Sequence, residues 1–132
     1  MSDIVKTAEQ AVHDELWKPA SPMVDGKIYE SRPMVEVGYP FIDFEDSDTN
    51  FRGTKNGLTA RVETRINIWD TEDNRRNVSE IGNILFQQAI SIRDAYGYPV
   101  TLRVNESGIR MMHDRTVTQA LWRCIVDLVF EI

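Results

Sequence analysis

The sequence predicts an α+β domain, in which a mostly antiparallel sheet of about four to five strands packs against an N-terminal helix and one long helix. Three observations support this fold class. Apolar residues recur at helical spacing near the N-terminus and again between residues 70 and 96. Residues 58–68 alternate strictly between two faces, and residues 118–132 are apolar along one whole face. We find no internal repeat or linker, so we expect residues 1–132 to form a single domain.

The first helix is expected to start at Ser2 or Asp3, which can both cap a helix, and to end at Pro19. Its expected buried face consists of Ile4, Val5, Ala8, Val12 and Leu16. Turn-forming residues then predict a loop over residues 18–26, and residues 27–31 predict a short strand that ends before Pro33.

Tyr39-Pro40 precedes a second expected strand, residues 41–48. Residues 47–57 are rich in turn formers and include Asn56-Gly57, which predicts a long, mobile hairpin connection. The strand at residues 58–68 follows. Its expected core face consists of Leu58, Ala60, Val62, Thr64, Ile66 and Ile68.

Asp70 or Thr71 is expected to cap the long helix, which should continue through Tyr96 and stop at Gly97. A fourth strand is expected at residues 100–104.

The last predicted strand, residues 118–132, has an apolar core face and a second face on which apolar and charged residues alternate. The second face consists of Leu121, Arg123, Ile125, Asp127, Val129 and Glu131. It is more apolar than a solvent-exposed face requires, so we expect it to contact a second element or another subunit. Edge strands of such a sheet can also pair with another chain.

The cysteine count and the hydropathy of the sequence indicate in which cellular compartment the protein assembles. The single cysteine, Cys124, excludes an intramolecular disulfide framework and favours a reducing compartment. No apolar run approaches the length of a membrane span, and residues 1–16 are too polar for a signal peptide. We therefore expect assembly in the cytoplasm and no membrane partner.

Charge is distributed unevenly. Residues 1–50 contain 11 acidic and 4 basic side chains, whereas residues 51–132 contain 10 acidic and 11 basic ones. Binding to nucleic acid through phosphate neutralisation needs clustered basic residues, which the sequence lacks. The acidic excess fits either a soluble surface or one of two complementary faces in an assembly.

The sequence offers little support for catalysis. His13 and His113 stand alone, Cys124 lies among apolar residues, and no glycine-rich nucleotide loop is present, so we expect no cofactor and no metal. The one enzymatic alternative is a metal-dependent nuclease that uses Asp43, Glu45 and Glu63. Arg65 stands where such a site needs a lysine, and arginine cannot release a proton to act as a base.

Several motifs, taken in chain order, form a recognisable series. They are the helix ending near Leu16-Trp17, Gly26-Lys27-Ile28-Tyr29 before Pro33, Tyr39-Pro40-Phe41-Ile42, Thr54-Lys55-Asn56-Gly57, Asn67-Ile68-Trp69-Asp70, the long helix and the apolar last strand. This order of elements resembles the small tail-completion, or tail-terminator, proteins of long-tailed bacteriophages. The resemblance covers nearly the whole chain and includes no catalytic signature.

This resemblance implies a non-enzymatic virion protein that forms a ring, usually hexameric, at the head-proximal end of a tail tube. Such a ring stops tube growth and offers a docking face to the head connector, while DNA passes through its lumen without specific binding. The implied partners are other copies of the chain, the tail-tube protein and the neck proteins. A head-completion or connector-adaptor protein is the alternative within the same class.

A closed ring needs two different patches that meet on neighbouring copies. The candidate interface residues lie in the long connection and on the last strand: Asp48, Phe51, Arg52, Lys55, Arg123 and Asp127. An acidic lumen would repel phosphate, and the candidate lumen residues are Asp43, Glu45 and Asp46.

Overall fold

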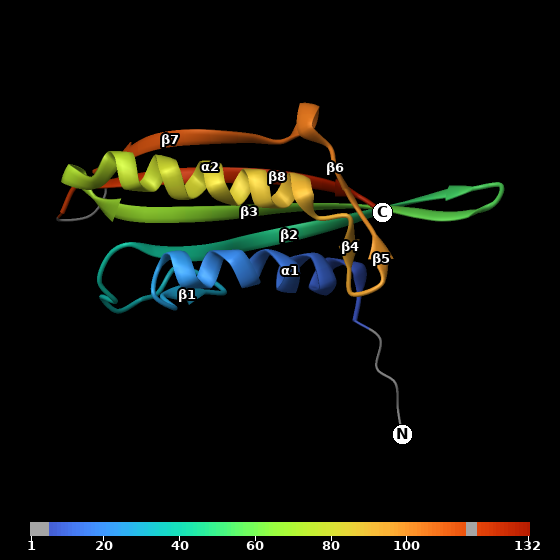
Figure 1. Ribbon diagram of the computed structural model, residues 1–132, viewed down its shortest axis with the longest axis horizontal. Coiled ribbons are helices and arrows are strands. Elements are labelled where there is room, and N and C mark those ends of the chain that lie inside the picture. Colours follow the sequence, from blue (N-terminus) through green and yellow to red (C-terminus); the bar gives the residue numbers. More distant parts are fainter. Residues whose placement is uncertain (1–5, 116–118) are drawn as a thin grey trace, which may run out of the picture.

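The computed structural model describes residues 6–115 and 119–132 and confirms the α+β fold (Figure 1). Six strands form one sheet in the order β1-β2-β3-β8-β6, with β7 also paired with β8. Helices α1 and α2 cover one face of this sheet. We call the other side the open face. No helix in the described part of the chain is long and apolar enough to cross a membrane.

Helix α1 (Ala8–Met23) starts and ends later than predicted. Its N-cap is Thr7, whose Oγ1 accepts a hydrogen bond from the Gln10 N–H at 3.1 Å. The expected caps and the first apolar positions, Ser2, Asp3, Ile4 and Val5, lie outside the described residues. Pro19 does not end the helix, and residues 18–23 of the expected loop are helical. Ala20 continues the buried stripe beyond Leu16, and this packing offsets the hydrogen bond that Pro19 cannot donate.

Strand β1 (Ile28–Tyr29) pairs in parallel with the start of β2 (Phe41–Thr54). Strand β2 then pairs along its length with β3 (Gly57–Thr71) in antiparallel register, with a bulge between Phe44 and Ser47. Only Lys55 and Asn56 form the turn, so the prediction of a long connection at residues 47–57 is wrong. Those residues form a tight hairpin whose end, residues 51–60, projects beyond the body of the sheet (Figure 1). We call residues 51–60 the hairpin arm.

The long helix is shorter than predicted. A 3-10 turn, η1 (Glu72–Asn74), precedes α2 (Arg75–Ser91). Gly97 is not the helix stop: with Tyr96 it forms the turn of a small hairpin, β4 (Asp94–Ala95) and β5 (Tyr98–Pro99), in which both turn residues have positive φ.

Strand β8 (Leu121–Glu131) lies in the centre of the sheet, as its apolar composition requires. One edge pairs with β3, and the other pairs with β6 (Thr101–Leu102) and β7 (Gly108–Asp114). The 3-10 turn η2 (Val104–Glu106) connects β6 to β7. Strand β7 was not predicted, because its side chains are all partly or fully exposed and show no alternation.

The core lies between the helices and the sheet. Cys124 of β8 is fully buried there and faces α2 at Gly82, where an added Cβ would overlap the Cys124 Sγ. Glycine at this helix position thus allows close approach of α2 to β8.

Burial raises the pKa of the Cys124 thiol to about 11. We therefore expect the folded protein to resist labelling by maleimide at pH 7.5 and the urea-unfolded chain to be labelled fully, since the thiolate is the reactive form. Mass spectrometry of both samples measures this difference. Rapid labelling of the folded protein would show that the packing at Gly82 opens readily.

The polar face of α1 holds one acidic side chain with several donors. Burial alone would raise the pKa of Asp14, but hydrogen bonds from Lys6, His13 and Gln10 outweigh it and lower the pKa to about 2. A lowered pKa stabilises the fold above the ordinary value of 3.8, and this contribution is lost as the pH falls towards 2.

We therefore expect Asp14→Asn to cost about 1 kcal/mol at pH 7, after allowance for solvent screening, and almost nothing near pH 2. Urea unfolding at several pH values measures this convergence. If the difference in free energy of unfolding between wild type and Asp14→Asn stayed constant from pH 7 to pH 2, the lowered pKa of Asp14 would be contradicted.

Candidate functional site

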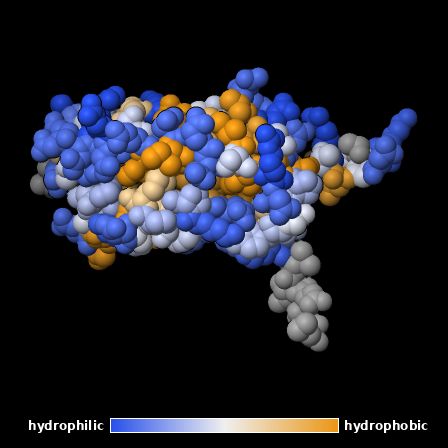
Figure 2. Space-filling model, in the orientation of Figure 1, coloured by the Kyte–Doolittle hydropathy of each residue, from blue (hydrophilic) through white to orange (hydrophobic). Residues whose placement is uncertain are grey.

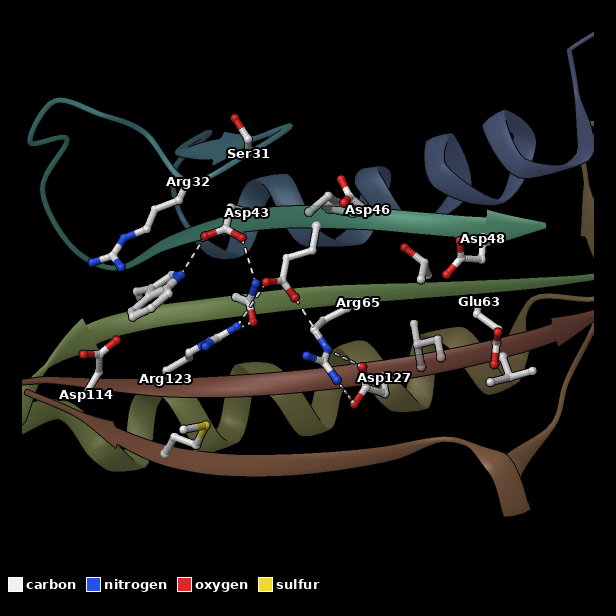
Figure 3. Close-up of a pocket in the computed structure, with 18 of the residues that line it drawn as sticks. Ser31, Arg32, Asp43, Asp46, Asp48, Glu63, Arg65, Asp114, Arg123 and Asp127 are labelled. Carbon is white, nitrogen blue, oxygen red and sulfur yellow. Dashed lines mark hydrogen bonds and ion pairs between the residues drawn. The ribbon is translucent and has the colours of Figure 1, made fainter. Parts of the chain in front are cut away.

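The open face of the sheet is hollowed into a groove of about 1090 Å³ (Figure 3). Side chains from β2, β3 and β8 form its floor, and both helices lie behind the sheet in this view. At one end an aromatic and aliphatic cluster closes the groove. This cluster consists of Phe41, Trp69 and Leu121, with Tyr29, Val37 and Tyr39 packed on it.

Next to this cluster, Asp43 is held inside the sheet surface with 1% of its area exposed. Its two carboxylate oxygens accept hydrogen bonds from Asn67 Nδ2 at 2.8 Å and Trp69 Nε1 at 2.7 Å. Burial raises the pKa of Asp43 despite these two donors. In the isolated subunit this carboxylate therefore contacts its own neighbours and not solvent.

Two guanidinium groups lie over the Trp69 ring, that of Arg32 at 4.3 Å and that of Arg123 at 5.1 Å from the ring centroid. Arg123 also donates to Asn67 Oδ1 at 2.9 Å and to Glu45 Oε1 at 3.3 Å. Arg123 therefore connects the buried Asp43 cluster to the more exposed charges of the groove.

The charges continue across three strands. Arg65 of β3 donates to both oxygens of Asp127 on β8, at 2.7 and 3.2 Å, and lies 3.5 Å from Glu45 on β2. Cations and anions thus alternate across the floor of the groove, and Arg65 and Arg123 each have a carboxylate partner there.

Further along the groove, two acids lie directly opposite each other. Asp48 of β2 is the cross-strand partner of Glu63 on β3, and like charges in such a pair are destabilising. Glu63 has Arg61 at 3.8 Å, whereas Asp48 forms no ion pair with any described residue. This end of the groove has a local excess of negative charge.

The hairpin arm has one apolar side. Phe51 and Leu58 are 66% and 67% exposed, and both lie on the same side of the hairpin as Ala60. Arg52 and Lys55 of the arm are exposed as well. Figure 2 shows apolar side chains at the base of the arm and polar ones at its tip.

The sequence-predicted interface residues therefore fall in two places. Phe51, Arg52 and Lys55 lie on the arm, and Asp48 lies on β2 just before it. Arg123 and Asp127 lie on the central strand β8, where β3 and β7 flank them, so they face the groove and not a lateral edge.

Of the predicted lumen residues, Glu45 and Asp46 are exposed and line the groove, whereas Asp43 is buried. Asn67 lies on the face of β3 opposite the predicted core face, yet it is buried with Asp43. Sequence reasoning did not connect Arg32, Asn67 and Trp69 to the site. An asparagine and a tryptophan on the polar face of a strand were the available signals.

The three acids of the nuclease alternative do not converge. Asp43 is engaged by Asn67 and Trp69, Glu45 contacts two arginines, and Glu63 lies opposite Asp48. Among residues 6–115 and 119–132, no three His, Cys, Asp or Glu side chains are grouped so that they could hold a metal ion.

No known family model matches the chain, and no curated protein matches it. Among solved structures, the chain is similar to one from the "Virion of native gene transfer agent (GTA) particle", with a TM-score of 0.65 and 11% sequence identity. The match covers 94% of this chain and 92% of that chain. At this level of identity the likeness establishes a common fold, which extends over nearly the whole length of both proteins.

Proposed function

We propose that the protein is a non-enzymatic virion component that forms a hexameric ring on the head-proximal end of a tail tube. The observation that carries this proposal is the fold, which over 94% of the chain matches a chain from a gene transfer agent virion. The order of elements, which resembles phage tail terminators, supports the more specific role of ending tube growth.

The hairpin arm supports a role in contacts between subunits. Exposed large apolar side chains on a projecting element are unfavourable in a monomer and are typical of interface anchors. Phe51 and Leu58 meet this description, and Arg52 and Lys55 beside them add polar contacts. In a ring the arm of one copy reaches a different surface of the next copy.

The groove supports a role as the lumen surface. Helices cover the opposite face, so the open face is the one that a ring can turn towards its axis. Glu45 and Asp127 neutralise the cations Arg65 and Arg123 there, and Asp46 adds further negative charge. Such a surface lets a DNA duplex pass without holding its phosphates.

We test the proposal with tail tubes assembled from the tube protein of the matching particle. Added protein is expected to appear as a cap at one tube end in electron micrographs and to shorten the tubes. Phe51→Asp should weaken capping. Ile84→Asp replaces another exposed apolar residue, on the outer face of α2, and serves as the matched control. Tube lengths that do not change with excess wild-type protein would refute the proposal.

The head-completion alternative makes a different prediction about order. Pull-down with separated tails and separated heads should recover tails first for a terminator and heads first for a connector adaptor. The enzymatic alternative is checked by incubation with plasmid DNA and Mg²⁺ or Mn²⁺, for which we expect no cleavage.

A further inference from the structure

The sheet has two edges that pair with nothing in the described part of the chain. Strand β7 pairs through one edge with β8, and its outer edge faces away from the sheet. On the opposite side, β1 covers β2 only at Ile42 and Asp43, which leaves the outer edge of β2 open from Glu45 onwards. Open edges of this kind are templates for pairing with a further strand.

The directions of the strands allow these two edges to join. Strands β2, β3, β8 and β7 are antiparallel in succession, so β7 runs opposite to β2. Rotation about the ring axis keeps the direction of every strand relative to that axis. In a ring, β7 of one copy would therefore lie antiparallel to β2 of the next copy, and the alternation would continue through the interface.

The register follows from the tilt of strands in a closed sheet. Within one subunit, Arg110 of β7 lies level with Ile125, Asn67 and Asp43 across the four strands. Asp48 lies level with Glu63, which is four residues from Asn67 along β3. An offset of four residues is about 13 Å, and four strands are about 19 Å wide, so a tilt of about 35° would bring Arg110 level with Asp48 of the next copy.

The neighbouring copy must also be displaced towards the hairpin end, since only that part of the β2 edge is open. The right-handed coiling of closed sheets displaces the copy beyond β2 towards the hairpin end. Its β7 then lies beside the open part of β2, past the two residues that β1 already covers.

The charges of the two edges are complementary. The β2 edge presents Glu45, Asp46 and Asp48, whereas β7 carries Arg110 near its start and His113 and Asp114 at its end, so the complementary pair is Arg110 with Asp48. Asp48 and Arg110 are both exposed, neither forms an ion pair with another described residue, and both lie on the open side of the sheet. In the register above, Arg110 would lie beside the like-charged pair Asp48 and Glu63. Pairing of two β2 edges would bring acids together, so the charges favour the ring contact over other edge contacts.

We propose that neighbouring copies join edge to edge, with β7 of one copy adding to β2 of the next and Arg110 pairing with Asp48. The second copy of this chain is thus the partner of both edges, and the sheet becomes continuous around the ring. This inference rests on the proposed ring-forming function and specifies its interface.

Charge exchange tests the pairing. Arg110→Asp and Asp48→Arg should each weaken self-association by about tenfold or more, because each places like charges opposite one another, and the double variant should recover most of the loss. Mass photometry measures the oligomer population. Asp73→Arg and Arg76→Asp change exposed charges on η1 and α2 and serve as matched controls. A double variant that associates no better than the single ones would overturn the pairing.

Disulfide trapping tests the register directly. With Arg110 opposite Asp48, Ile109 lies opposite Thr49, so the variant Thr49→Cys with Ile109→Cys should form intermolecular disulfides under mild oxidation and give a ladder of covalent oligomers. Buried Cys124 does not interfere. The control variant pairs Thr49→Cys with Asp73→Cys and should give no ladder.

Trapping accumulates even weakly associated copies, so absence of the ladder at high protein concentration would refute the edge pairing. The tube-capping assay gives a separate result. Capping without a 49–109 disulfide would refute this interface and leave the proposed function in place. A 49–109 disulfide without capping would support the interface and refute the proposed function.

Discussion

Replacing Phe44 with alanine should lower the free energy of unfolding by about 3–5 kcal/mol, because the change leaves a cavity in a close-packed region. Phe44 is 2% exposed and lies on the helix side of β2. Its ring centroid is 4.9 Å from that of His13 and 5.5 Å from that of Trp17. These three rings join α1 to β2, so the loss falls on the docking of that helix.

Urea unfolding followed by tryptophan fluorescence and by circular dichroism measures this effect. Phe51→Ala is the matched control, since it removes the same side chain from the same strand at a position that is 66% exposed. We expect the control to change stability by less than about 0.5 kcal/mol. Equal losses in the two variants would show that the ring cluster does not hold α1.

Periodicity predicted the elements that have one face in the core. Strand β3 from Val62 to Ile68, strand β8 and the middle of both helices follow their apolar patterns, because burial against the other layer decides these segments. The prediction that Leu58 lies on the core face is wrong, because Leu58 is on the hairpin arm and is 67% exposed. The small elements could not be predicted in this way. Strand β7 is a partly exposed edge strand, and β4 and β5 together bury little, so neither leaves a clear pattern in the sequence.

The hairpin arm shows a second reason why prediction from the sequence fails. Asn, Gly, Ser and Thr in residues 47–57 favour turns in isolation, yet the structure continues β2 and β3 through them. Pairing between the two strands satisfies the backbone there, and since the arm covers no core, its side chains are not required to alternate. Phe51 could be predicted as a contact residue because it is a large apolar side chain among polar ones. The part of β2 that carries Phe51 could not be predicted, because it has no alternating pattern.

The site itself was predicted only in part. The acids of β2 were identified from their clustering, but their roles differ, because the bulge after Phe44 and the neighbouring strands give each a separate environment. Asp43 is buried by contacts with Asn67 and Trp69, residues 24 and 26 positions away, which no local pattern reveals. Glu45 instead meets arginines of two other strands. Sheet register, and not spacing along the chain, determines which charges compensate each other.

Replacing Asp43 with alanine should cost about 2–4 kcal/mol, because Asn67 Nδ2 and Trp69 Nε1 would then be buried without acceptors. Asp43→Asn keeps the volume but can accept from only one of the two donors without a clash, so we expect an intermediate loss of about 1–2 kcal/mol. Asp46→Ala removes an exposed acid three residues away and should have an effect below about 0.5 kcal/mol. Urea unfolding of the four proteins at pH 7 gives this order.

The pH dependence distinguishes this carboxylate from Asp14. Burial raises the pKa of Asp43, so the folded state binds the proton more tightly than the unfolded chain does. Its contribution to stability is therefore present below the ordinary pKa of 3.8 and is lost as the pH rises through the raised value. Wild type should gain stability relative to Asp43→Asn as the pH falls from 7 to 4, whereas it should lose stability relative to Asp14→Asn on going from pH 4 towards 2. If both comparisons moved in the same direction, burial would not control the protonation of Asp43, and the closed Asp43–Asn67–Trp69 cluster would have to be open to solvent.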